Sequence, residues 1–425
     1  MPELASGPIS LQTGIDFEDA GPGNKVSLFR RALLRRNIRV ITSAKSGNEK
    51  LPLWGAMYGG EVRLFRGIMS ADVGISVHKL ARDKAATKAV LAESGLNVPQ
   101  SFQLQRDPNF LKRQFADLEK AGLIPGVLKP NSGSHGRGVT MGIRTPDELE
   151  AALSLAGESA VFEQQIEGYD YRMLTVGNTL VAATERKPAY VVGDGVSTIK
   201  QLVEKKNETR TRNPSTRNHP IKLDSISAGC LAQQNLSETS VPDNGKQVWL
   251  RTVANVGSGG EAFDRTPLVH PGFVEICESV PALVGSPEIL GIDIIARDIS
   301  VDPAKQEWAI LELNANPDID LQHWPWAGRR RDIADRLAQF YFPLTEIADP
   351  AVAMLQIGGK VRLPKLYRWI ESYGVLAGLR IESLESTTGL GLQLVGSQAA
   401  IDWFIEMLIR SRTGAIVRSI EISTK

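Results

Sequence analysis

The chain has 425 residues, of which 42% are hydrophobic and 23% are charged, and its formal net charge is +1. This near-neutral charge gives no bulk electrostatic reason to expect binding to nucleic acid. A chain of this length is too long for one compact core, so we expect two to four domains. The two cysteines, Cys230 and Cys277, are too few for a disulfide framework and have no metal-binding spacing.

The N-terminal stretch MPELASGPIS has no basic region followed by an apolar segment, so we expect no signal peptide. No apolar run approaches the length of a transmembrane helix. We therefore expect a cytoplasmic protein with reduced thiols and no membrane partner.

Hydrophobic periodicity predicts alternating helices and strands along most of the chain. Helical patterns occur, in chain order, at residues 26–36, 81–95, 108–125, 145–157, 272–285, 329–342, 363–375 and 399–411. Strand patterns occur at residues 38–43, 126–130, 160–166, 171–193, 289–299, 308–315, 352–361, 379–386, 390–397 and 415–422. The pair Gly177-Asn178 predicts a hairpin turn, whereas the polar, irregular stretch 205–247 predicts a long loop.

The stretch LKPNSGSHGRGV, residues 128–139, combines a lysine with a glycine-rich segment. Backbone N–H groups in such a turn can converge on an anion, because glycine tolerates positive φ. Lys129 and Arg137 would add positive charge and hydrogen-bond donors. The loop lacks the order of a Walker A motif, and by itself it fits a phosphate-binding loop or a hairpin whose glycines only turn the chain.

Acidic and amide side chains occur within two strongly apolar strand patterns. Asp293 lies in ILGIDII, and Glu312 and Asn314 lie two residues apart in AILELNANPD, so the latter two share one strand face. Buried-type strands rarely carry acids without a reason. Two carboxylates and an amide oxygen are ligands that suit Mg²⁺ bound together with substrate phosphates. Salt-bridged acids on surface strands are the alternative, which the apolar flanks disfavour.

Further motifs follow one another between roughly residues 60 and 345. They are ARDKAATKAVLAESGLNVP, KPNSGSHGRGV, VFEQQIEGYDYRMLTVG, ATERKPAYVVGDGVSTIKQLV, VPDNGKQVWLRTVANVGSGGEAFDRT, GIDII and ELNANPDID. In sequence and order they resemble the ATP-grasp carboxylate–amine ligases, with particular similarity to the ATP-grasp parts of cyanophycin synthetase and bifunctional glutathione synthetase.

The resemblance implies an ATP-grasp fold of mixed α/β and α+β class with an additional C-terminal domain. We expect an N-terminal α/β region at 1–98, a small lid subdomain at 99–170 and a large subdomain at 171–348. After Pro343 the pattern changes to βαββαβ, which predicts a ferredoxin-like domain at 349–425.

The resemblance also implies site residues and cofactors, namely ATP with Mg²⁺ or Mn²⁺. The residues implied to bind ATP are Lys84, Lys129, Ser132, Gly133, Ser134, His135, Gly136, Arg137, Gly138, Glu163, Gln164, Ile166 and Asp170. Those implied to bind metal are Asp293, Glu312 and Asn314. Those implied to face the acyl phosphate and the substrate carboxylate are Arg172, Arg251, Asn255, Gly259 and Gly260. For His135 a structural role is an equal alternative. For Arg172 and Arg251 the alternative is a surface salt bridge.

The implied reaction is ligation of a carboxylate to an amine through an acyl phosphate, with release of ADP. Phosphoryl transfer depends on positioning and charge neutralisation, which agrees with a site of cations, acids and glycines. We expect small-molecule acid and amine substrates, such as amino acids or peptides, no nucleic acid partner, and a homo-oligomer. Arg210, Arg212 and Arg217 fit an anionic substrate or a solvated loop. A non-catalytic nucleotide-binding regulator and a kinase remain alternative functions.

The segment from Lys360 to Ile422 resembles acylphosphatase in its order of elements. Its loop GGKVRLPKLYRW does not place Arg362 or Arg368 at the catalytic arginine position, and LRIESLES lacks the expected asparagine. We therefore expect a non-hydrolytic domain that mediates dimerisation or covers the substrate entrance. The segment after residue 345 is too short for the second halves of the two similar enzyme groups, so we expect a stand-alone ligase.

Overall fold

The computed structural model describes residues 24–42, 53–104, 108–130, 138–156, 160–358, 363–384, 390–411, 413 and 416–424. The chain divides into two compact units. The first comprises Met1–Asp72, Asp318–Asp320 and Asp332–Lys425, and the second comprises Val73–Pro317 and Leu321–Arg331. The first unit thus joins segments from both ends of the chain. The finer four-part division expected from the sequence stays a prediction.

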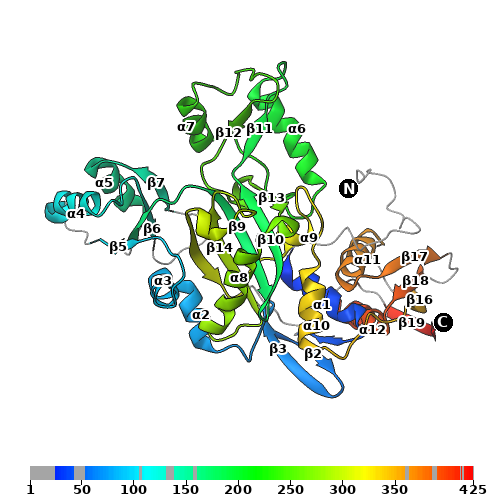
Figure 1. The fold of residues 1–425 in the computed structure, drawn as a ribbon. Coiled ribbons are helices and arrows are strands. Elements are labelled where there is room, and N and C mark those ends of the chain that lie inside the picture. Colours follow the sequence, from blue (N-terminus) through cyan, green and yellow to red (C-terminus); the bar gives the residue numbers. More distant parts are fainter. Residues whose placement is uncertain are drawn as a thin grey trace. The chain divides into compact units, whose positions relative to one another are not determined.

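The centre of the second unit is a five-stranded antiparallel sheet (Figure 1). Its strands, in spatial order, are β13 (Glu261–Asp264), β10 (Thr179–Lys187), β9 (Tyr169–Val176), β14 (Ile289–Ala296) and β15 (Trp308–Asn314). The predicted hairpin joins β9 and β10, and Gly177 adopts a φ of 55° in its turn. This sheet carries most of the acids and arginines of the candidate site.

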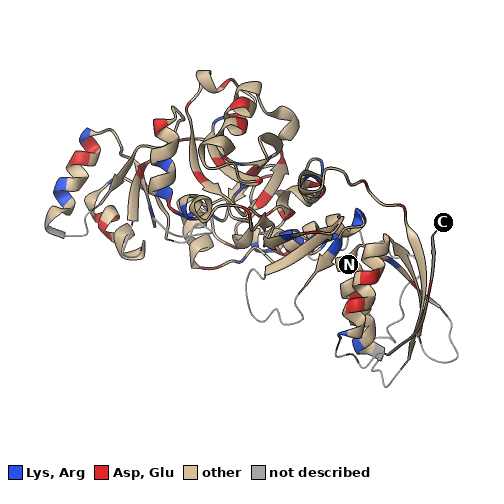
Figure 2. Ribbon diagram, turned by 90° about the horizontal axis from the view of Figure 1, so that it is seen from below, with Lys and Arg blue, Asp and Glu red and all other residues tan. Residues whose placement is uncertain are grey.

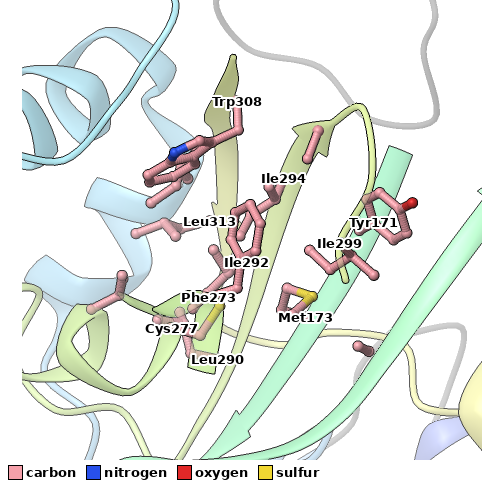
Figure 3. Close-up of a cluster of buried hydrophobic side chains, with 14 of the residues drawn as sticks. Tyr171, Met173, Phe273, Cys277, Leu290, Ile292, Ile294, Ile299, Trp308 and Leu313 are labelled. Atoms are coloured by element: carbon pink, nitrogen blue, oxygen red, sulfur yellow. The ribbon is translucent and has the colours of Figure 1, made fainter. Parts of the chain in front are cut away.

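One face of this sheet is covered by helices and forms a dense apolar core (Figure 3). The helices around it are α2 (Ile75–Arg82), α3 (Lys84–Glu93) and α8 (Pro271–Leu283). Phe273 of α8 meets Trp308 of β15 edge-to-face, with ring centroids 5.4 Å apart. Ile292 and Ile294 of β14 are fully buried in the same cluster. Burying each such side chain contributes about 1.5–3 kcal/mol, so this core stabilises the site-bearing strands.

A smaller four-stranded antiparallel sheet in the same unit carries Lys129 and Glu163. Its order is β5 (Ser101–Gln103), β8 (Ala160–Gln164), β6 (Gly126–Pro130) and β7 (Thr140–Ile143). It packs in one apolar cluster with α4 (Pro108–Lys120) and α5 (Pro146–Leu155). Thr145 and Glu148 form a reciprocal capping box at the start of α5, which satisfies two otherwise unpaired N–H groups.

The predicted long loop at 205–247 is wrong, because this stretch contains most of one helix and all of another. They are α6 (Ile199–Thr211) and α7 (Ser225–Gln233), and they share an apolar cluster with the short hairpin β11 (Tyr190–Val192) and β12 (Gln247–Trp249). Capping boxes begin both helices, at Thr198 with Gln201 and at Asp224 with Ser227. The sequence here is too polar to show a clear helical period, but capping and tertiary packing stabilise both helices.

The N-terminal part of the first unit is a helix on a four-stranded sheet. The elements are α1 (Lys25–Arg35), β1 (Arg39–Ile41), β2 (Leu53–Tyr58), β3 (Glu61–Arg66) and β4 (Met69–Ser70). Phe29, Trp54 and Phe65 form an aromatic cluster with Tyr341 of α10 (Ile333–Tyr341). The cluster explains why segments far apart in sequence form one compact unit.

The C-terminal segment forms a second sheet in the first unit. Its elements are β16 (Ala351–Gly358), α11 (Leu363–Ala377), β17 (Arg380–Leu384), β18 (Leu390–Gly396), α12 (Gln398–Ile409) and β19 (Ile416–Thr424). The sheet is antiparallel, with the order β17-β18-β16-β19. Asn37, just after α1, accepts a hydrogen bond from the Ala399 N–H at 2.8 Å. The C-terminal segment is therefore hydrogen-bonded to the turn that follows α1.

Short helical segments connect the larger elements: η1 (Val256–Ser258), η2 (Thr266–Leu268), η3 (Pro303–Lys305) and α9 (Asp320–His323). Lysines and arginines are interspersed with aspartates and glutamates along the described elements (Figure 2). Within the described residues, no helix has both the length and the apolar character needed to span a bilayer.

Candidate functional site

Asp293 of β14 is the centre of a buried charge network in the five-stranded sheet. Arg172 of β9 is its direct cross-strand partner and binds it in a bidentate manner, with Nη2 donating to Oδ2 at 2.9 Å. Arg186 of β10 donates from Nη2 to the same oxygen at 2.8 Å. Burial opposes ionisation of Asp293, but the two arginines outweigh burial and hold the pKa of this carboxyl below its usual range.

Arg186 connects Asp293 to Asp170, one of the residues expected to bind ATP. Its Nε donates to Asp170 Oδ1 at 2.6 Å. Burial raises the pKa of Asp170, and the nearby Asp293 carboxylate raises it further, although Arg186 opposes both effects. The sequence interpretation missed Arg186. A charged residue in the strand ATERKPAYVV could have drawn attention to it, but the sequence contains no sign of its partners.

Glu312 and Asn314 of β15 lie beside Asp293. Glu312 is the cross-strand partner of Asp293, and Lys84 Nζ lies 3.4 Å from Glu312 Oε2. Burial and the neighbouring Asp293 raise the pKa of Glu312. Asn314 accepts a hydrogen bond from the Asn316 N–H at 3.1 Å through its side-chain oxygen. The sheet register therefore groups the three residues expected to bind metal.

This donor set fits a hard divalent cation in its chemistry, since it offers two carboxylates and an amide oxygen. Burial and the adjacent Asp293 carboxylate raise the pKa of Glu312, and a bound cation would offset both effects. In the part of the chain that the structure describes, no group of three or more His, Cys, Asp and Glu side chains is placed to hold a metal. A cation held by Asp293 and Glu312 would therefore also draw on the amide oxygen of Asn314.

Glu163 of β8, one of the residues expected to bind ATP, lies between two lysines. Lys129 Nζ of β6 lies 2.8 Å from Glu163 Oε2, and Lys88 of α3 contacts Oε1. Burial opposes ionisation of Glu163, yet the lysines outweigh it and lower the pKa of this carboxyl. The sequence interpretation missed Lys88, although its spacing of four residues from Lys84 places both lysines on one helix face.

The remaining residues expected around ATP are placed only in part. The Gln164 N–H donates to the Gln100 carbonyl at 2.9 Å, and Ile166 is buried. Gly138 adopts a φ of 72°, in the left-handed region that favours glycine. Residues 132–137, which include most of the expected phosphate loop, lie outside the described residues.

Of the residues expected on the substrate side, Asn255, Gly259 and Gly260 form a compact turn before β13, whereas Arg251 lies just after β12 and Arg172 lies in β9. Arg251 donates to the carbonyls of Leu250 and Lys222 at 2.8 and 3.1 Å, and to Asp224 Oδ2 at 2.8 Å. It therefore ties the segment before α7 to the end of β12. A surface salt bridge was the alternative for Arg251. Its bonds to two backbone carbonyls do not fit that alternative.

The glycines of this turn also have specific structural constraints. The Gly259 N–H donates to the Val256 carbonyl at 3.0 Å, and the Gly260 N–H donates to the Asn255 carbonyl at 2.9 Å. Gly259 has a φ of 96°, and a Cβ there would lie 2.8 Å from Ile221 Cγ1. The turn thus requires glycine, and both N–H groups are hydrogen-bonded within it.

The chain is similar to several known proteins. Residues 81–191 match the model of the RimK-like ATP-grasp domain. Cyanophycin synthetase from Crocosphaera subtropica is 33% identical over 317 residues, which cover 73% of this chain and 36% of that protein. The glutathione biosynthesis bifunctional protein GshAB from Clostridium perfringens is 31% identical over 276 residues, which cover 62% of this chain and 34% of that protein.

A solved structure shows the same relationship. The crystal structure of a bifunctional glutathione synthetase from Pasteurella multocida aligns with a TM-score of 0.55 and 26% identity, covering 74% of this chain and 43% of that chain. This chain spans 36% of the length of the first cyanophycin synthetase and 34% of the clostridial protein. The chain therefore contains a RimK-like ATP-grasp domain that is homologous to the ATP-grasp regions of cyanophycin synthetase and GshAB.

Proposed function

We propose that this protein is an ATP-dependent ligase that joins a carboxylate to an amine through an acyl phosphate and releases ADP. The observation that carries this proposal is the convergence of Asp293, Glu312, Arg172 and Lys84 in a domain homologous to those of amide-forming enzymes. The same site would use ATP, with Lys84, Lys129 and the loop through Gly138 at the phosphates. Glu163, Gln164, Ile166 and Asp170 would lie at the nucleoside.

Asp293, Glu312 and Asn314 would hold Mg²⁺, or Mn²⁺ in its place. A divalent cation bound there supplies charge neutralisation for the phosphates. The protein's own part is to place cations and acids in a rigid sheet, so that the carboxylate and the phosphoryl group meet in a fixed orientation. No covalent nucleophile is needed, because the acyl phosphate is already an activated electrophile.

Arg172 and the turn that contains Asn255, Gly259 and Gly260 would face the acid substrate. Arg251 would tie the segment before α7 to the end of β12. In this proposal Arg172 exchanges part of its contact with Asp293 for the substrate carboxylate. The proposed substrates are a small acid and a small amine, such as amino acids or peptides. The protein itself would form a homo-oligomer in the cytoplasm.

The C-terminal segment would be a ferredoxin-like, acylphosphatase-like module without hydrolytic activity. Its sheet order β17-β18-β16-β19, with a helix after each of β16 and β18, supports the ferredoxin-like assignment. Arg368 is exposed on α11, where its Nε donates to the Pro364 carbonyl at 3.3 Å. Arg362 lies outside the described residues.

The purified full chain, incubated with ATP, Mg²⁺ and a panel of amino acids, dipeptides and small acids, tests the proposal. We expect release of ADP and phosphate that depends on both an acid and an amine, with the amide identified by mass spectrometry. Release of AMP and pyrophosphate would contradict an acyl phosphate. Phosphate retained on the product would indicate a kinase, and nucleotide binding without turnover would indicate a regulator.

A further inference from the structure

Arg210 is one of the largest fully buried side chains of the chain. It lies on α6 with 1% of its surface exposed. Its polar sequence context fits a solvated loop or a contact to an anionic substrate. Neither description holds, because its hydrogen-bond partners are backbone carbonyls.

The guanidinium of Arg210 bridges two separate segments of the chain. Its Nε and Nη2 donate to the His219 carbonyl at 3.1 and 2.8 Å. Its Nη1 donates to the Gly260 carbonyl at 3.2 Å. The planar fork of arginine can make these bonds at once, whereas the single ammonium of a lysine cannot reproduce that geometry.

A buried ion cluster supports this bridge. The Glu261 side chain is fully buried, and Lys206 Nζ lies 2.8 Å from its Oε1 while Arg210 Nη1 lies 3.7 Å away. Lys206 also lies 3.7 Å from the centre of the Tyr190 ring. The cluster thus contains two cations from α6 and one anion from β13, so Glu261 would keep a partner without Arg210.

The Gly260 carbonyl lies directly before the strand that borders the charge network of Asp293. In the register of β13 and β10, Glu261 pairs with Lys187 and Ala262 pairs with Arg186. A Cβ on Gly260 would lie 2.7 Å from the Lys187 carbonyl, so the turn lies against β10. Figure 1 shows α6 beside β11 in this part of the unit. A shift of α6 would therefore act on the turn next to Arg186.

We propose that Arg210 is a positioning residue that holds the Gly259–Gly260 turn against β10 by bridging the carbonyls of Gly260 and His219. This rests on the proposed function, in which the turn faces the acid substrate. Arg210 itself touches neither ATP nor substrate. Its loss would loosen the substrate side of the site and leave the ATP side unchanged.

Two variants separate the geometry of the fork from its charge. Arg210→Gln removes the fork and leaves Lys206 and Glu261 as a balanced pair, whereas Arg210→Lys keeps the charge and removes the fork. Arg212→Lys is the matched control, since Arg212 follows α6 directly and is exposed. Hydrogen exchange measured by mass spectrometry on the full chain, without substrate, reports on the turn directly.

We expect amides of residues 254–262 to exchange at least about tenfold faster in both Arg210 variants, because bonds to a charged donor are lost. Amides of β14 and β15 should exchange as in the unchanged chain, as should all amides of Arg212→Lys. With the acid and amine that release the most ADP, the KM for the acid should rise about tenfold or more while the KM for ATP stays within about twofold.

Unchanged exchange of residues 254–262 would overturn the proposal. So would equal acceleration throughout the second unit, or failure of both variants to fold, because Arg210 would then serve only general stability. Normal behaviour of Arg210→Lys alone would show that charge, and not the bridge, is required, which also overturns it. If no substrate pair releases ADP, the ligase proposal fails while the exchange experiment still decides the role of Arg210.

Discussion

Asp293 and Glu312 are direct cross-strand partners at the centre of the second unit's sheet. Burial and the like charge of the adjacent Asp293 carboxylate raise the pKa of Glu312. Arg172 and Arg186 bind Asp293, while Lys84 lies beside Glu312. The sheet thus concentrates acids that are partly compensated by cations, an arrangement suited to a charged ligand more than to stability.

Glu312→Gln should abolish turnover and leave the fold intact. The substitution removes a proposed metal ligand and also removes repulsion with Asp293, so we expect at least about a hundredfold loss of ADP release with no fall in the unfolding temperature. Glu275→Gln is the control, because Glu275 is exposed on α8. Activity equal to that of the control would refute the metal assignment.

Arg186→Met should strongly destabilise the second unit. It leaves Asp170 and Asp293 without the cation they share, and breaking a buried ion pair in this way costs about 3–5 kcal/mol. Denaturant unfolding followed by circular dichroism measures the change in the free energy of unfolding. Arg297→Met is the comparison, because Arg297 pairs with Glu167 at 3.7 Å on the surface, and such a pair contributes about 0–1 kcal/mol. Equal effects of the two substitutions would contradict a buried network.

Lys88→Met should destabilise the fold more near neutral pH than in acid. The folded-state pKa of Glu163 lies below its ordinary value of 4.5. Its ion pairs therefore stabilise the protein above that value and lose their effect as the pH falls through the folded-state pKa. The difference in free energy of unfolding between Lys88→Met and the unchanged chain should shrink between about pH 7 and about pH 3.5. A constant difference over this range would contradict the role of Glu163.

Gly126→Ala should destabilise the smaller sheet. A Cβ at Gly126 would lie 2.0 Å from Phe162 Cζ, and overpacking of this kind costs about 1–3 kcal/mol or more. Adding Phe162→Leu should restore part of the loss, because the smaller side chain frees space. Gly229→Ala is the control, since a Cβ there meets nothing within 4 Å and alanine favours the helix. Thermal unfolding of the three variants distinguishes steric conflict from a general effect of alanine.

Local patterns in the sequence were sufficient to predict much of the fold. Apolar periodicity located the central strands, and Gly177-Asn178 marked the hairpin between β9 and β10. The acids Asp293 and Glu312 in apolar strands, with the amide of Asn314 two residues after Glu312, led to a metal-site assignment that stays a prediction. The strand and hairpin predictions succeeded because strand alternation and turn formation depend on near neighbours.

Long-range contacts could not be read in the same way. Nothing in the polar stretch around Arg210 indicates that this arginine is buried on backbone carbonyls, and no motif pairs Lys88 with Glu163. Likewise, the packing of Phe29 on Tyr341 joins residues of opposite chain ends in one unit. Whether a charged side chain is solvated or buried depends on which distant segment covers it, since burial penalises a charge that lacks a partner. Only the packing of the strands and helices against one another determines which charged side chains of the site are buried and which partners they have.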